Sequence, residues 1–197
     1  DRPEEALPWA GRAAELLPVQ SIAHFNLGNI RRAVGDLEPA SAAFETAIGL
    51  DPSFTNAHWN LACCRLLAGE FAPGWSEYEW RGRAGEVVID EYPQPRWHGE
   101  PLVGRTILVH AEQGIGDEIL FASCIPDLIA RGGRTIVVCE PRLERLFARS
   151  FPEAIVRGFL RRKDRRGIAL DEKIEFQIPM GSLLLVFRPS RESFPAR

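Results

Sequence analysis

An all-helical repeat followed by a parallel α/β unit is the fold class that this 197-residue sequence predicts. Three observations indicate it: a 34-residue self-similarity in the N-terminal half, a break rich in proline and glycine, and β-branched runs alternating with helical spacing in the C-terminal half. We therefore expect helical hairpins over residues 1–82, a linker over 83–104 and a parallel α/β domain over 105–197.

The N-terminal repeat is visible when the sequence is shifted by 34 positions, which aligns Gly35 with Gly69 and Phe44 with Tyr78. Glycine readily ends a helix in the left-handed conformation, and a proline such as Pro52 cannot continue one. The large side chains Phe44 and Tyr78 are expected to fill the space between paired helices. These signals predict helices at about 4–17, 21–34, 37–50, 55–68 and 71–82.

The middle repeat carries the residues that mark a tetratricopeptide repeat, and the N-terminal half resembles that family through Leu27, Gly28, Gly35, Ala40, Phe44, Ala47 and Pro52. Such repeats stack so that their first helices line a concave face that grips extended peptides. The resemblance implies a protein or peptide partner, and the candidate peptide-binding residues are Asn26, Asn29, Asn60 and Arg65. A structural arm or an oligomerisation surface is the alternative.

The last repeat and the segment after it are rich in aromatic residues. Trp75, Tyr78 and Trp80 lie within six positions, which predicts an outer face that packs on the next domain, with a peptide or sugar platform as the alternative. Prolines and glycines crowd the following segment, so 83–104 is predicted to be a linker or a loop along a domain edge, pinned by Trp97.

The C-terminal half alternates short apolar strands with helices joined by short loops. Strands are predicted at 106–110, at 135–139, near 155–156 and at 174–178, and helices at 117–130, 142–150 and 183–187. Pro126 is expected to bend or interrupt the first of these helices. The alternation predicts a parallel, Rossmann-like sheet.

Ligand-binding and catalytic residues of such a sheet are expected in the loops at the carboxyl ends of its strands, here 110–117 and 179–182. Gly114 and Gly116 permit close backbone approach, but Ile119 stands where a dinucleotide fingerprint has its third glycine, which disfavours a dinucleotide cofactor. A carboxylate at position 117 could act in catalysis or cap the following helix. His110 and Glu112 form a His-x-Glu triplet, which is the first part of the zinc deaminase motif. The second part, Pro-Cys-x-x-Cys, does not follow, so no metal site is predicted.

The run from His110 to Glu118, with Phe121 and Pro126, resembles the opening of the heptosyltransferase-like glycosyltransferases. That resemblance implies a GT-B fold of two Rossmann-like halves, an acceptor bound to the first half and a nucleotide-sugar donor bound to the second. By the same resemblance Asp117 is the general base of an inverting transfer. The expected acceptor-binding residues are Glu112, Gln113, Gly114, Gly116 and Ser182.

No resident cofactor is expected. The donor-binding half would follow Arg197, so we expect this chain to be a fragment, with a glycan or protein acceptor and no sugar transfer of its own. A non-catalytic protein-interaction scaffold is the alternative function.

Composition limits the other function classes. Hydrophobic residues make up 45%, which suffices for a core, and a net charge of −3 excludes a globally basic nucleic-acid binder. The basic segment 142–166 is interpreted as a solvated surface rather than a nucleic-acid or phosphate site. No apolar run reaches the ~20 residues of a membrane span, and four cysteines without a Cys-x-x-Cys pair indicate buried thiols in a reducing cytoplasm.

Overall fold

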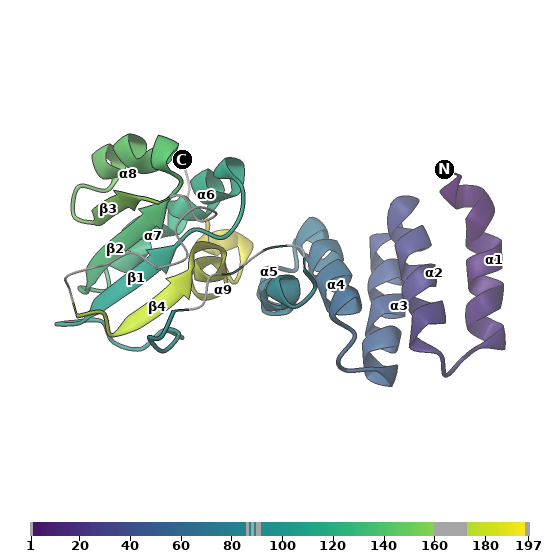
Figure 1. Cartoon of the computed structure of the whole chain (residues 1–197). Helices are drawn as coiled ribbons and strands as arrows, with labels where there is room; N and C mark the ends of the chain where they lie inside the picture. Colours follow the sequence, from purple (N-terminus) through teal and green to yellow (C-terminus); the bar gives the residue numbers. More distant parts are fainter. Residues whose placement is uncertain (1, 86, 88, 90–91, 160–172, 196–197) are drawn as a thin grey trace. The chain divides into compact units, whose positions relative to one another are not determined.

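The computed structural model describes residues 2–85, 87, 89, 92–159 and 173–195, and the chain divides into two compact units (Figure 1). Residues 1–86 together with 188–197 form the first, which we call the helical unit. Residues 87–187 form the second, which we call the sheet unit. Helical hairpins in one unit and a parallel sheet in the other confirm the predicted fold class.

In its described residues the helical unit has five antiparallel α-helices, and the first four agree with the predicted ranges to within one residue. The fifth is shorter than predicted, because its last turn tightens to a 3₁₀ helix. The side chain of Arg81 in that turn donates from Nη1 to the Tyr78 carbonyl at 3.1 Å. The helices are α1 (Pro3–Leu16), α2 (Ser21–Ala33), α3 (Leu37–Leu50), α4 (Thr55–Ala68) and α5 (Phe71–Tyr78), followed by η1 (Glu79–Gly82).

Phe44 is the centre of the helical core. Its side chain is fully buried with Leu61 and Cys64, and partly buried Phe25 packs against the same cluster. Gly28 of α2 lies directly on the Phe44 ring, where an added Cβ would be 2.6 Å from the nearest ring carbon. The small residue that the repeat pattern predicted is therefore required by close helix approach.

The outer face of α5 is covered by a later segment of the chain. Trp75 Nε1 donates to the Arg188 carbonyl at 3.0 Å, and the rings of Phe71 and Phe194 lie 4.9 Å apart. Residues 188–195 therefore pack with the helices, whereas the sequence analysis placed them in the α/β domain. The reason is that apolar surface on α5 is buried by these residues, a contact that no local pattern encodes.

Within the part of the chain that the structure describes, four parallel strands form a sheet in the order β3-β2-β1-β4 (Figure 1). They are β1 (Thr106–His110), β2 (Arg134–Cys139), β3 (Ile155–Gly158) and β4 (Phe176–Pro179). Leu108, Ile136 and Val138 form a buried cluster on the sheet, while Ile107, Val109 and Val137 alternate with them and are also buried. Burial on both faces explains why these strands read as continuous apolar runs.

The helix predicted at 117–130 is interrupted. α6 (Ile115–Phe121) is followed by η2 (Ala122–Cys124) and then by α7 (Ile125–Ile129). Pro126 lacks a backbone N–H and its ring would clash with the preceding turn of a continuous helix, so the chain restarts with Pro126 in the first turn of α7. The other helical segments of the unit are η3 (Pro141–Leu143), α8 (Glu144–Ser150), η4 (Met180–Ser182) and α9 (Leu183–Phe187).

Residues 95–97 run along the outer edge of β4. Trp97 donates its backbone N–H to the Gln177 carbonyl at 2.9 Å, and the Gln177 N–H is donated to the Pro95 carbonyl at 3.0 Å. The Trp97 side chain is 1% exposed. The segment 83–104 was predicted to be either a linker or a loop along a domain edge. Residues 95–97 lie along the edge of the sheet, as in the second interpretation.

Candidate functional site

The candidate site lies at the carboxyl end of β1, in the turn that leads into α6. Gly114 and Gly116 are exposed and Asp117 is half-buried. The Asp117 carboxylate accepts the backbone N–H of Gly114 at 3.2 Å, which satisfies one of the unpaired donors at the start of α6. Asp117 therefore caps its own helix and still keeps part of its side chain at the surface.

Glu112, one of the predicted acceptor-binding residues, is directed to a neighbouring loop. Its side chain is buried, and Oε1 accepts the backbone N–H of Gly181 at 2.7 Å. An added Cβ at Gly181 would collide with that oxygen and approach the Phe121 ring at 3.0 Å. The loop after β4 is thus shaped around the Glu112 carboxylate.

Glu118 makes the corresponding contact on the other side of β1. The side chain is buried, and Oε2 accepts the backbone N–H of Glu140 at 2.9 Å, just after β2. No role was predicted for Glu118 from the sequence. Glu118 lies three residues before Phe121 and seven before Ile125, which are both buried. This helical spacing was the sequence signal that Glu118 faces the core.

Ser182 and Gln113, the other predicted acceptor-binding side chains, differ in exposure. Ser182 is buried, and its Oγ accepts a hydrogen bond from Arg96 Nη2 at 2.5 Å. Gln113 is half-buried beside the exposed Gly114. The structure thus keeps Gln113, Gly114, Gly116 and Asp117 together at the surface and places Glu112 and Ser182 beneath it.

His110 is a core residue. Its side chain is fully buried, with Nε2 at 2.9 Å from Gln177 Oε1 and the Tyr92 ring at 4.5 Å. In the described residues, no group of three or more His, Cys, Asp or Glu side chains is arranged to hold a metal ion. The four cysteines, which all lie in the described part of the chain, form no disulfide.

The predicted peptide-binding asparagines lie on the first helices of two successive repeats. Asn60 of α4 donates from Nδ2 to Asn29 Oδ1 of α2 at 2.7 Å, so the two amides share one surface. Asn26 is exposed one helical turn before Asn29.

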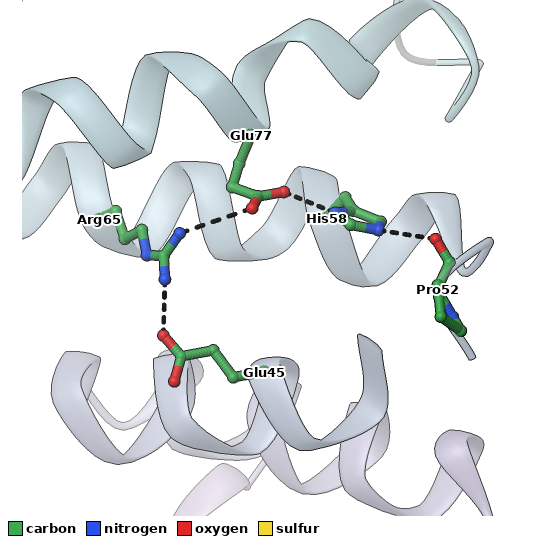
Figure 2. Close-up of polar contacts among 5 residues, drawn as sticks. All are labelled: Glu45, Pro52, His58, Arg65 and Glu77. Carbon is green, nitrogen blue, oxygen red and sulfur yellow. Dashed lines mark hydrogen bonds and ion pairs between the residues drawn. The ribbon is translucent and has the colours of Figure 1, made fainter. Parts of the chain in front are cut away.

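Arg65 is separated from the asparagines. Five residues correspond to about 500° of helix rotation, so Arg65 and Asn60 point about 140° apart on α4. Figure 2 shows Arg65 between Glu45 of α3, at 2.7 Å, and Glu77 of α5, at 3.5 Å. Arg65 therefore bridges the second helices of two repeats, and its role in peptide binding stays a prediction.

Glu77 extends this network to His58 (Figure 2). His58 Nδ1 lies 2.5 Å from Glu77 Oε2, and Nε2 lies 3.1 Å from the Pro52 carbonyl oxygen. Both neighbouring oxygens are hydrogen-bond acceptors. The ring also stacks on Trp80 with a centroid separation of 3.8 Å. The network ties α3, α4 and α5 together, from buried His58 to exposed Glu45.

Two further predictions concern the surface. Residues 160–166 of the basic segment 142–166 lie outside the described residues, and within the rest Arg142 pairs with Glu140 at 2.7 Å. None of the helices in the described ranges is both long and apolar enough to cross a membrane.

Comparisons with known proteins give one curated relative. No protein-family model matches the chain. Protein FlbA of Caulobacter vibrioides is 30% identical over 205 aligned residues, which cover 92% of this chain and 33% of FlbA. The chain thus spans about a third of the length of this relative.

Among solved structures, a mutant O-GlcNAc transferase of Thermobaculum terrenum aligns with 77% of this chain and 36% of its own, at 15% identity and a TM-score of 0.36.

Proposed function

We propose that this chain is the acceptor-binding part of an inverting, nucleotide-sugar-dependent glycosyltransferase that carries a tetratricopeptide-repeat arm. The observation that carries the proposal is the placement of Asp117. A carboxylate that stays partly exposed at the carboxyl end of the central strand β1, beside two exposed glycines, suits a catalytic role at this edge. The residues from His110 to Glu118 that resemble the heptosyltransferase-like family form this turn.

Asp117 would act as the general base. As an acceptor hydroxyl attacks the anomeric carbon of the donor sugar, its proton passes to the Asp117 carboxylate. The new C–O bond forms while the bond to the nucleotide phosphate breaks, which inverts the anomeric configuration. Gln113, Gly114 and Gly116 would contact the acceptor, and the resemblance assigns the donor to a second Rossmann-like half.

The test is sugar transfer by the full natural protein that contains these residues, with Asp117→Asn as the variant. Asparagine keeps an oxygen that can accept the Gly114 N–H, so the cap survives while the base is lost. We expect transfer of a radiolabelled sugar to fall by roughly 100-fold or more. Asp127→Asn, on α7 of the same unit, is the control and should leave transfer unchanged. Equal activity of both variants would exclude Asp117 as the base.

The tetratricopeptide-repeat arm is proposed to bind an extended peptide through Asn26, Asn29 and Asn60. A protein that serves as sugar acceptor could supply this peptide. The hydrogen bond between Asn29 and Asn60 uses one polar atom of each amide. The second polar atoms, Asn29 Nδ2 and Asn60 Oδ1, are a donor and an acceptor, which are the two kinds of group that pair with a peptide backbone.

A non-catalytic interaction scaffold is the second candidate. It is favoured by the capping contact of Asp117 with Gly114, since a helix cap needs no catalytic role. The scaffold interpretation predicts that neither the natural protein nor its Asp117→Asn variant transfers sugar, while both still bind the same peptide. The domain boundaries at 82 and 105 and a cytoplasmic location stay predictions.

A further inference from the structure

Two buried carboxylates flank the turn that carries Asp117. Glu112 precedes the turn and Glu118 follows Asp117 directly, and each side chain is 3% exposed. A buried carboxylate is costly unless hydrogen bonds compensate for its lost hydration. Each of these carboxylates accepts a backbone N–H from a different loop.

The two contacts reach opposite neighbours of β1. β1 lies between β4 and β2 in the sheet. Glu112 accepts from Gly181, which follows β4, and Glu118 accepts from Glu140, which follows β2. The turn is thereby held on both sides, at the two residues that bracket Asp117 and its Gly114 contact.

The two hydrogen bonds, at 2.7 Å and 2.9 Å, have the lengths expected for a backbone N–H that donates to a carboxylate. Hydrogen bonds to an ionised acceptor are shorter and about twice as strong as bonds between neutral groups. Gly181 also leaves no room beside Glu112 Oε1, since an added Cβ would overlap that oxygen. The Glu112 carboxylate consequently has little freedom to move away from the loop after β4.

We propose that Glu112 and Glu118 are positioning residues, which fix the turn from Gly114 to Asp117 so that the Asp117 carboxylate stays at the carboxyl edge of the sheet. The functional meaning of this placement rests on the proposed role of Asp117 as base. The mechanical coupling itself concerns only residues of this chain and can be measured without substrate.

The test compares Glu112→Leu and Glu118→Leu with Glu112→Gln and Glu118→Gln in the whole chain. Glutamine keeps an acceptor oxygen, whereas leucine of similar size has none. Exposed Glu153 provides the matched control, Glu153→Leu. The readouts by NMR are amide hydrogen exchange at Gly181, Glu140 and Gly114 and the carboxyl ¹³C resonance of Asp117.

Each leucine variant should raise exchange at its own partner amide, Gly181 or Glu140, by about tenfold or more. It should also raise exchange at Gly114 and shift the Asp117 carboxyl resonance, whereas the glutamine variants and the control leave both near wild type. Faster exchange at Gly181 and Glu140 with Gly114 and Asp117 unchanged would overturn the proposal, because the carboxylates would then only join loops.

Gly181→Ala provides a second route if a leucine variant does not fold. Its methyl group would displace the Glu112 carboxylate and leave that residue chemically intact. The same changes at Gly114 and Asp117 are expected, and their absence counts against the proposal. If Asp117→Asn keeps its activity in the transfer assay, Asp117 is not the base, but the hydrogen-exchange results are unaffected. The two proposals can therefore fail separately.

Discussion

At the residue scale, the thiol of Cys139 at the carboxyl edge of the sheet shows how burial changes a pKa. Cys139 at the end of β2 is fully buried, and its sulfur lies 3.8 Å from the Arg157 carbonyl oxygen. Burial raises the pKa of the Cys139 thiol from 9.0 to about 12, and the nearby carboxylates of Glu118, Glu144 and Glu140 add to the rise. The Cys139 side chain therefore packs in the core, and its raised pKa disfavours the thiolate that a nucleophile needs.

The raised pKa of Cys139 predicts a pH dependence of stability. Because the folded state holds the thiol proton more tightly than the unfolded state, this contribution is complete below pH 9 and is lost as the pH rises from about 9 to about 12. Cys139→Ala removes it, so the free energy of unfolding of the variant should fall less steeply over this window. Urea unfolding at pH 8 and pH 10.5 measures the difference, with Cys63→Ala as control. Parallel pH curves for wild type and Cys139→Ala would contradict the assignment.

At the scale of elements, helix pairing in the first unit depends on one close approach. Gly28 of α2 faces the ring of Phe44 in α3, and both residues are buried. Glycine costs a helix about 0.5–1 kcal/mol relative to alanine, so its presence here reflects packing and not helix propensity.

Gly28→Ala tests this balance. The added methyl group meets the Phe44 ring, and we expect the free energy of unfolding to fall by about 1–3 kcal/mol. Gly49→Ala in α3 is the matched control, because nothing apart from the adjoining residues and backbone of its own helix lies within 4 Å of its added Cβ. That variant should gain about 0.5–1 kcal/mol. Urea unfolding followed by circular dichroism distinguishes them, and a gain in both would refute the close-approach argument.

At the scale of the whole molecule, the chain leaves the helical unit and later returns to it. The sheet unit spans residues 87–187, and the segment from 188 packs again on α5. The last helix of the repeat is thus completed by residues 113 positions later in the sequence, as the bond between Trp75 and Arg188 shows. The helical unit is discontinuous in sequence for this reason.

Deletion of residues 188–197 should uncover Trp75 and Phe71. We expect a red shift of tryptophan fluorescence and a loss of about 2 kcal/mol in the stability of the helical unit, from the apolar surface returned to water. In a Trp75→Phe background the same deletion should give no red shift. An unchanged spectrum and thermal midpoint after deletion would show that the segment contributes nothing to the unit.

Local patterns predicted most of the elements and part of the candidate site. The first four helices could be predicted from the 34-residue repeat and from glycine and proline, which end helices through local backbone geometry. The four strands could be predicted from short apolar runs rich in β-branched residues. Asp117 could be placed at the carboxyl end of a strand because a strand, a short turn and a helix follow one another in the sequence.

The sequence by itself determined the helical repeat, the parallel sheet and the turn that bears Asp117, since these depend on neighbours along the chain. The tertiary structure alone decided that Glu112 and Glu118 lie beneath that turn, that Arg65 joins α3 to α5, and that residues 188–195 cover Trp75. Those outcomes depend on which backbone N–H, charge or apolar surface is brought close by folding. Partners so far apart in sequence leave no periodic signal for a single sequence to reveal.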